Sequence, residues 1–289
     1  MKKLLDRIFI DGLGGMAQGL FATLIIGTII QQIGLFMGGG TGDLIYELGK
    51  IAAGLTGAGI GVGVARKLEA GHLVIVSAAV VGMIGAFAGK ILSGQVLVDG
   101  NLVLAGPGEP LGAFAAAYLA IEIGILISGK TKLDIILTPL VCIGTGSAVG
   151  LFVGPPISEF MLWLGSLINW GTEQQPFLMG IVVSVLMGMI LTLPISSAAL
   201  GVILNLSGLA AGAATIGCCC NMIGFAVASW RENKFSGFLA QGIGTSMLQI
   251  PNIVRRPLIW LPVILSSAVL GPIGTMLLHM TNNATGSGM

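Results

Sequence analysis

The chain has 289 residues, of which 55% are hydrophobic and only 9% are charged, and its net charge is +1. Soluble domains carry about 25% charged residues, so this composition excludes a water-soluble globular fold and predicts an integral membrane protein. The apolar segments are long and do not alternate as barrel strands do, which favours an all-α polytopic helical bundle. The small net charge gives no reason to expect a nucleic acid as a partner.

Apolar runs of near-membrane length follow one another along the chain. A spanning helix needs about 20 residues, and several of the runs are shorter, so re-entrant hairpins are expected among them. In chain order, the predicted spans and part-spans are Phe9–Phe36, Leu44–Ala65, Leu73–Leu92, Leu111–Ser128, Ile135–Val153, Ile157–Ile168, Phe177–Leu193, Ile195–Leu206, Leu209–Ala228, Gly237–Ile250 and Leu258–Leu278.

The positions of Lys and Arg predict the orientation, because these residues collect on the cytoplasmic side of a membrane. If their clusters are all cytoplasmic, the N-terminus is cytoplasmic, and each gap between clusters holds an even number of crossings. The gap Phe235–Val254 is too short for two crossings, so Gly237–Ile250 is predicted to be re-entrant. The loop Gly94–Pro110 is predicted to form an outer hairpin or lid. The clusters are Lys2, Lys3 and Arg7; Arg66 and Lys67; Lys130 and Lys132; Arg231 and Lys234; and Arg255 and Arg256.

The stretch Pro176–Arg256 is apolar enough for a bilayer, yet Pro, Gly, Ser and Asn interrupt it repeatedly. Lipid tolerates broken helix only inside protein or around a cavity, and transporters bind substrates at such breaks. Ser, Asn and Gln side chains can hydrogen-bond a neutral solute such as a sugar. A bundle helix with kinks and packing glycines is the alternative. The polar residues predicted to bind solute are Ser196, Ser197, Asn205, Asn221, Gln241, Ser246, Gln249 and Asn252.

Glu122 is also a predicted substrate-binding residue, because a carboxylate deep in a span is costly unless paired or hydrated, and by default it marks a pathway. A structural carboxylate within the bundle is the alternative. His72 and His279 are the only histidines, and neither has a second ligand at metal spacing. Walker, Rossmann and nucleophile-elbow motifs do not occur, so the sequence predicts no metal, cofactor or catalytic residue.

The segment Leu137–Trp170 carries a Thr-Pro pair, a span of small residues and a Gly-Pro turn, and it resembles the enzyme IIC membrane subunits of the bacterial phosphotransferase system. The runs MGMILTLPISSAALG, SGLAAGAATIGCCCNMIGFAVASW and QGIGTSMLQIPNIV resemble the PfoR-type branch, whose members are described as enzyme IIC-like transporters or toxin regulators. The resemblance covers nearly the whole chain. It implies a homodimeric carrier in the bacterial inner membrane, with an interface region at 1–134 and a substrate-binding region with re-entrant segments at 135–289.

The same resemblance bears on the chemistry. In sugar-phosphorylating relatives a His pair and a Glu-Pro motif serve the substrate, and here Pro194–Ser197 and Gln249–Pro251 stand in those places. The change removes ionisable groups, so phosphorylating activity is left open, and any IIA and IIB partners are separate proteins. The sequence therefore predicts a carrier for a sugar or sugar-like neutral solute. A membrane sensor that regulates toxin expression without transport is the alternative.

Overall fold

The computed structural model describes residues 6–98, 101–104, 106–172, 174–194, 197, 200–201, 204, 206–283 and 286–288. The chain divides into two compact units, Met1–Ser158 and Glu159–Met289, which we call unit 1 and unit 2. The boundary between them falls inside one long helix. This structural division does not test the functional division into 1–134 and 135–289, which stays a prediction.

Unit 1 begins with a long helical run in which π-helical and α-helical segments alternate. Its elements in chain order are η1 (Arg7–Gly12), α2 (Leu13–Leu20), η2 (Phe21–Ile25), α3 (Ile26–Met37), α4 (Gly39–Gly54), α5 (Thr56–Lys67), α6 (His72–Ala86), α7 (Ala88–Leu92), β1 (Leu97–Val98), β2 (Asn101–Leu102) and α8 (Pro110–Ile127). The two strands pair antiparallel, with Leu97 opposite Leu102. The hairpin predicted within Gly94–Pro110 is therefore confirmed.

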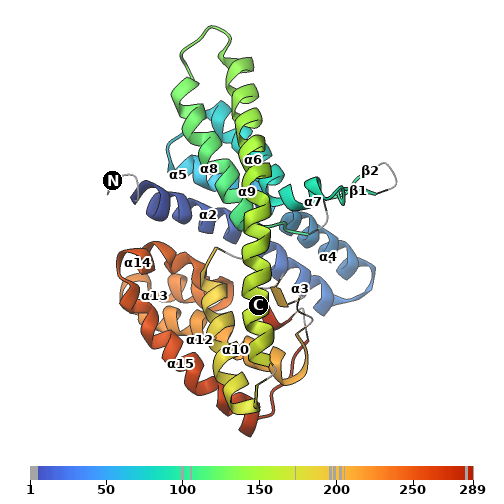
Figure 1. Ribbon diagram of the computed structural model, residues 1–289, viewed down its shortest axis with the longest axis vertical. Coiled ribbons are helices and arrows are strands. Elements are labelled where there is room, and N and C mark those ends of the chain that lie inside the picture. The colour runs from blue at the N-terminus through green and yellow to red at the C-terminus, as the bar shows by residue number, and fades with distance from the viewer. Residues whose placement is uncertain are drawn as a thin grey trace. The chain divides into compact units, whose positions relative to one another are not determined.

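The small-residue helix α5 packs against α2, α6 and α8 (Figure 1). Small residues let helix backbones approach closely, which is how helices associate in lipid. A Cβ atom at Gly61 of α5 would overlap the backbone oxygen of Ala78 on α6, and one at Gly19 of α2 would overlap that of Gly59. The glycines of TGAGIGVGVA thus set the helix spacing in unit 1.

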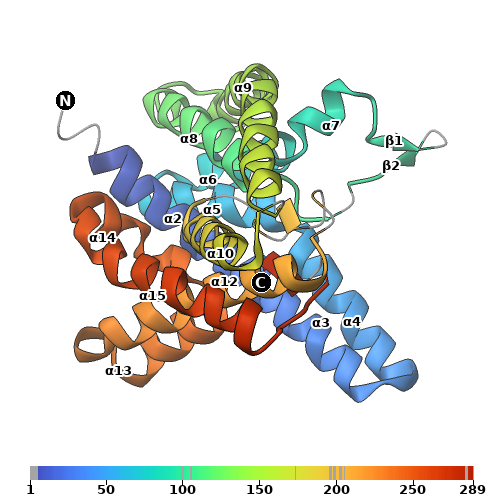
Figure 2. The same ribbon diagram turned by 60° about the horizontal axis from the view of Figure 1, so that its bottom comes forward.

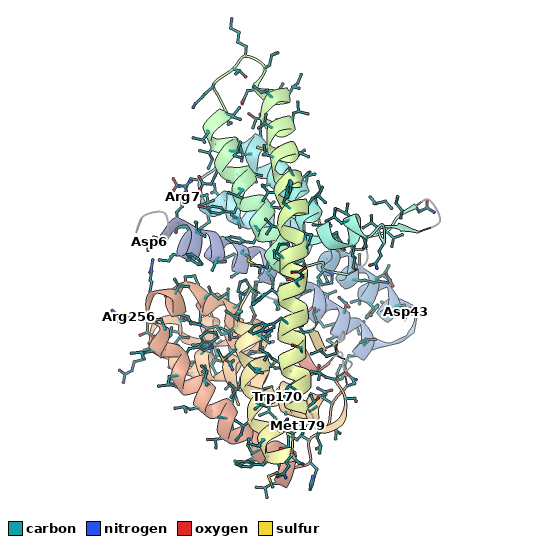
Figure 3. All side chains as sticks on the ribbon, viewed as in Figure 1. Asp6, Arg7, Asp43, Trp170, Met179 and Arg256 are labelled. Carbon is teal, nitrogen blue, oxygen red and sulfur yellow. The ribbon has the colours of Figure 1, made fainter. Side chains whose placement is uncertain are left out.

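The helices α3 and α4 form a hairpin and run side by side in both Figure 1 and Figure 2. Gly38 makes the turn with φ +62°, a conformation that favours glycine. Asp43 lies in α4 shortly after this turn (Figure 3). The hairpin exposes many large apolar side chains, with Phe36 95% exposed, beside the exposed ion pair of Lys50 and Glu47. Such a surface suits contact with lipid chains rather than water.

Unit 2 is built around three packed helices, α10, α12 and α15. The long helix α9 (Asp134–Thr172) supplies residues to both units. A Cβ atom at Gly217 of α12 would overlap the backbone oxygen of Ser184 on α10, so these two helices also meet at a glycine. The further elements are α10 (Pro176–Thr192), α12 (Gly208–Ala228), α13 (Trp230–Leu239), η3 (Ala240–Gly244), η4 (Ser246–Gln249), α14 (Ile250–Arg255), η5 (Pro257–Trp260), α15 (Leu261–Pro272), η6 (Ile273–Leu277) and η7 (Gly286–Gly288).

Within the described ranges, five helices are long and apolar enough to cross a membrane, and the bent pair α4–α5 raises the number to six. The fold class predicted from sequence, an all-α polytopic membrane protein, is confirmed. The five helices are Arg7–Met37, Pro110–Ile127, Asp134–Ile157, Gly208–Ala228 and Pro257–Leu277.

The predicted span Leu44–Ala65 corresponds to α4 and α5, which pass as a span only together, because the helix breaks at Leu55 and its two parts are bent by 50°. At the break, the Thr56 hydroxyl donates to Ala53 O at 2.6 Å and occupies a carbonyl at the end of α4. The run Leu73–Leu92 also differs, since α6 ends at Ala86 and is too short to span.

The turn predicted after Val153 is wrong as well, because α9 continues through Pro155 and Pro156. Each proline removes only one backbone N–H donor, and the other hydrogen bonds of the helix remain. Membrane helices tolerate such losses where neighbouring groups compensate. By contrast, the interruption predicted within Gly237–Ile250 is present, since Thr245 is extended between η3 and η4. Its re-entrant course stays a prediction. The run Ile195–Leu206 lies largely outside the described residues.

Candidate functional site

A buried polar cluster surrounds Asn221 in α12, and we call it the Asn221 hub. Asn221 Oδ1 accepts hydrogen bonds from Thr192 Oγ1 at 3.2 Å and from Trp260 Nε1 at 3.3 Å. Asn221 Nδ2 donates to Gly217 O at 3.1 Å and to Ser267 Oγ at 3.3 Å. A second hydroxyl pair, Thr192 Oγ1 and Ser246 Oγ, lies 2.9 Å apart. The members of the hub are Asn221, Thr192, Ser246, Trp260 and Ser267.

The hub joins elements that are far apart in the sequence. Thr192 ends α10, Ser246 begins η4, Trp260 ends η5 and Ser267 lies within α15. All except Trp260 are fully buried. An amide has two N–H donors and two acceptor lone pairs, and all four of those of Asn221 face a partner, with the single proton of Thr192 shared between Asn221 Oδ1 and Gly188 O. In this conformation the hub is therefore a satisfied structural junction, without capacity left at Asn221 for a solute.

A second polar group, which we call the amide ladder, begins where α12 ends. Gln241 Nε2 donates to Ser229 Oγ at 2.9 Å, Gln249 Nε2 donates to Gln241 Oε1 at 2.8 Å, and Asn252 Nδ2 donates to Gln249 Oε1 at 2.8 Å. Gln241 and Gln249 are 3% and 6% exposed, whereas Asn252 is exposed. The ladder, Ser229–Gln241–Gln249–Asn252, thus places two buried glutamines between a half-buried serine and an exposed asparagine.

The ladder has spare hydrogen-bonding capacity. The described bonds use one N–H and one lone pair of each glutamine amide, and Asn252 contributes only an N–H. Since a primary amide has two donors and two acceptor lone pairs, each of these three amides has unused groups that could hydrogen-bond a solute hydroxyl. Gln241 lies in η3 and Gln249 ends η4, so the two bonded glutamines come from either side of the break at Thr245.

The hub and the ladder each include one residue of α12 or its end, Asn221 in the hub and Ser229 in the ladder. Asn221 and Ser229 are separated by about 12 Å along α12, at 1.5 Å per residue. Both groups consist of amides, hydroxyls and an indole, so their members carry no charge at neutral pH. Beyond the ladder's surface end, Arg255 and Arg256 are exposed, and Figure 3 labels Arg256. In the part of the chain that the structure describes, no group of His, Cys, Asp or Glu is placed to hold a metal ion.

Glu122 belongs to α8 of unit 1, where its carboxylate pairs with Arg7. Arg7 Nε lies 2.6 Å from Glu122 Oε1 and Nη2 lies 3.3 Å from Oε2, so the pair is bidentate and charge-assisted. Tyr118 lies one turn before Glu122 and interacts with both partners, although its buried hydroxyl makes no hydrogen bond of good geometry. The pairing gives Glu122 a structural partner, and its assignment to the substrate site stays a prediction.

The structure thus groups four of the predicted residues along α12 and its neighbours, namely Asn221, Ser246, Gln241 and Gln249, with Asn252 at the surface. Ser197 is buried and instead donates to Gly288 O at 2.6 Å. Ser196 and Asn205 lie outside the described residues.

Sequence reasoning missed Thr192, Ser229, Trp260 and Ser267. Ser267 lies in the middle of the predicted span Leu258–Leu278, so the argument that selected Glu122, a polar residue deep in a span, also applies to it. Thr192 and Ser229 end apolar runs, where the sequence does not distinguish a helix end from a site. Trp260 carries no sequence signal of its own, because its role depends on Asn221.

The sequence model of the family described as "Phosphotransferase system, EIIC" matches residues 10–289. The match includes every residue of the hub and of the ladder. No curated protein matches the chain closely enough to be given as a relative.

Proposed function

Since the chain belongs to the EIIC family of the phosphotransferase system, whose members are membrane transport subunits, we propose that it carries a sugar or sugar-like neutral solute across the bacterial cytoplasmic membrane. The observation that supports this proposal is the amide ladder, which offers uncharged donors and acceptors on two buried glutamines next to an exposed asparagine. The resemblance to enzyme IIC proteins extends the proposal to a homodimer.

The chemistry of the ladder favours a neutral polyol over an ion. Each hydroxyl of a polyol both donates and accepts, and the free capacity of Gln241, Gln249 and Asn252 contains both kinds of group. An anion or cation placed among uncharged amides would lose its hydration without an opposite charge, which is costly in a buried site. Hydrogen-bonding groups in a mostly apolar surround are also the usual composition of a small-molecule site.

The distribution of Lys and Arg indicates which side of the membrane the ladder faces. Arg231 and Lys234 follow Ser229 closely, and Arg255 and Arg256 follow Asn252. If these clusters are cytoplasmic, the ladder opens towards the cytoplasm and the start of α12 lies on the opposite side. A solute entering the cell would then pass the region of Asn221 before it reaches the ladder.

Uptake into proteoliposomes tests the proposal. The purified chain is reconstituted and offered a panel of radiolabelled hexoses and hexitols, with the corresponding sugar acids and amino sugars as charged counterparts. We expect at least one neutral compound to enter and its charged counterparts to enter at least tenfold more slowly. Preferred uptake of a charged compound would contradict the proposed neutral site.

Two further measurements separate the alternatives. Binding of a neutral compound without flux would favour the sensor that regulates toxin expression. Addition of a phosphorylated IIB protein distinguishes plain passage from phosphoryl transfer, because the solute then appears inside either free or phosphorylated. The amides at Gln241 and Gln249 lack ionisable groups for phosphoryl transfer, so we expect free solute.

A further inference from the structure

A group of exposed basic side chains lies beside the exposed end of the ladder, and we call it the basic rim. Two of its members belong to α13, and two lie at or directly after the end of α14. The ladder joins these segments, because Ser229 directly precedes α13 and Asn252 lies within α14, with hydrogen bonds of 2.8–2.9 Å linking them through two glutamines. Packing of Ile253 against Phe225 also holds α14 against the end of α12. The members of the rim are Arg231, Lys234, Arg255 and Arg256.

The chain itself does not neutralise the positive charge of the rim. Glu232 is the only carboxylate in 229–256, and no carboxylate in the described part of the chain forms an ion pair with a rim cation. Like charges repel one another, and a surface that collects them raises the local concentration of anions. The rim is therefore suited to an anionic partner.

Two candidate spanning helices place the rim at the boundary of the membrane. The span Gly208–Ala228 ends shortly before the first rim residue, and the span Pro257–Leu277 begins directly after the last one. Exposed apolar side chains accompany the cations, with Trp230 46%, Phe235 63% and Leu258 80% exposed. Tryptophan is enriched where a membrane meets water. A phospholipid offers an anionic headgroup and acyl chains together, whereas a free phosphate ion matches only the charge.

Unit 1 has an equal number of clustered cations that lack these companions. The two loops that carry them lie side by side, since a Cβ atom at Gly71 would lie 3.5 Å from Ser128 Oγ. Each loop also contains a carboxylate, Glu69 in one and Asp134 in the other, and neither contains Phe, Tyr or Trp. We expect this group to bind anionic lipid more weakly, which makes it a matched control for the rim. Its cations are Arg66, Lys67, Lys130 and Lys132.

We propose that the basic rim binds the phosphate groups of anionic phospholipids at the membrane surface, next to the exposed end of the ladder. The inference goes beyond the proposed function, because the rim has the same charge whichever solute the ladder binds. A guanidinium can hold a phosphate through two hydrogen bonds, and Lys adds a point charge. Each Lys or Arg near an anionic lipid surface strengthens binding by about fivefold. Trp230 and Phe235 then contact the lipid below its headgroup.

Native mass spectrometry of the purified chain in detergent tests the proposal by measuring the affinities for phosphatidylglycerol and for phosphatidylcholine, which has no net charge. The thermal midpoint of each variant shows that it is folded. The rim variant carries Arg231→Gln, Lys234→Gln, Arg255→Gln and Arg256→Gln. The control variant carries Arg66→Gln, Lys67→Gln, Lys130→Gln and Lys132→Gln. A third variant keeps the charge of the rim through Arg231→Lys, Arg255→Lys and Arg256→Lys.

We expect the wild-type chain to bind phosphatidylglycerol at least tenfold more tightly than phosphatidylcholine, and the rim variant to lose at least tenfold in phosphatidylglycerol affinity. The control and lysine variants should stay within threefold of wild type. Soluble glycerol phosphate, the headgroup without acyl chains, should not displace the lipid.

Equal wild-type affinities for the two lipids would overturn the proposal, as would an equal loss in the rim and control variants or displacement by glycerol phosphate. Unchanged phosphatidylglycerol binding in the rim variant, together with lost binding of a phosphorylated IIB protein, would also overturn it and assign the rim to an acidic protein. A wild-type chain that transports nothing would refute the proposed function without altering these affinities.

Discussion

The Asn221 hub and the amide ladder are made of the same kinds of side chain, yet their hydrogen bonding differs in one decisive respect. Asn221 has a partner for every donor and acceptor, and most of its neighbours are fully buried. The ladder glutamines have partners for half of their capacity, and the ladder ends at an exposed amide. Saturation indicates a structural junction, whereas spare capacity on a path to the surface indicates a place for a solute.

The difference has an energetic basis. A polar group buried in apolar surroundings is costly unless it is hydrogen-bonded, so a saturated cluster holds its elements in a single arrangement. The hub holds α10, α12, η4 and α15 in this way. The ladder leaves unused groups that water or a solute must satisfy, and exchange between these two is what a carrier requires. The two groups should therefore respond to substitution in opposite ways.

The largest effect on stability is expected for Asn221→Ala. The substitution removes four hydrogen bonds and leaves Trp260 Nε1 and Ser267 Oγ to find new partners, so we expect a loss of about 2–3 kcal/mol in unfolding free energy. The thermal midpoint in detergent micelles measures the loss. Asn233→Ala, at an exposed position on α13, is the control and should change little. An Asn221 variant as stable as this control would show that the hub is not a junction.

A slightly smaller effect is expected for Gly217→Ala, which tests whether the close approach of α10 and α12 sets the hub geometry. The added Cβ meets the backbone oxygen of Ser184, so the helices must move apart, at a cost of about 1–3 kcal/mol. Gly144→Ala in α9 is a matched control, because its Cβ would meet nothing within 4 Å. If both variants have the same thermal midpoint, α10 and α12 are not held by this contact.

The pH dependence of stability distinguishes the uncharged groups of unit 2 from an ionisable group in unit 1, Glu109. Burial raises the pKa of Glu109, which precedes α8, to about 7, partly opposed by the Leu111 backbone N–H. The folded state then binds more protons than the unfolded state between the ordinary carboxyl pKa of about 4.3 and about 7. Stability should therefore fall as pH rises through this window.

Thermal midpoints measured between pH 5 and pH 8 follow this response. Glu109→Gln should remove most of the slope, whereas Gln249→Ala in the ladder should leave it unchanged. A slope that persists in Glu109→Gln would assign the titration to another group.

The smallest effect is expected for Glu122→Gln. The ion pair with Arg7 is about one-third exposed, and pairs of that kind contribute roughly 0.2–1 kcal/mol. We expect a small decrease in thermal midpoint and uptake within twofold of wild type. The same uptake assay tests the role assigned from sequence, since a loss of tenfold or more would place Glu122 in the substrate site.

The fold class and the break within Gly237–Ile250 followed from sequence, because composition and helix-breaking residues report directly on membrane burial and backbone continuity. The distinction between Asn221 and Gln249 did not, since both are amides in an interrupted apolar run and only the structure shows how many partners each has. The continuation of α9 through Pro155 and Pro156 was missed for a related reason. Sequence shows the loss of a donor but not the neighbours that compensate for it.

The most direct test of the account compares transport and stability in Gln249→Ala, with Gln32→Ala, an exposed glutamine on α3, as the matched control. Uptake of the transported neutral compound and the thermal midpoint are measured on the same preparations. The account predicts that Gln249→Ala loses at least tenfold in uptake while its stability falls by no more than about 1 kcal/mol. Wild-type uptake in this variant, or a large loss of stability accompanying the loss of uptake, would contradict the assignment of the ladder to the solute.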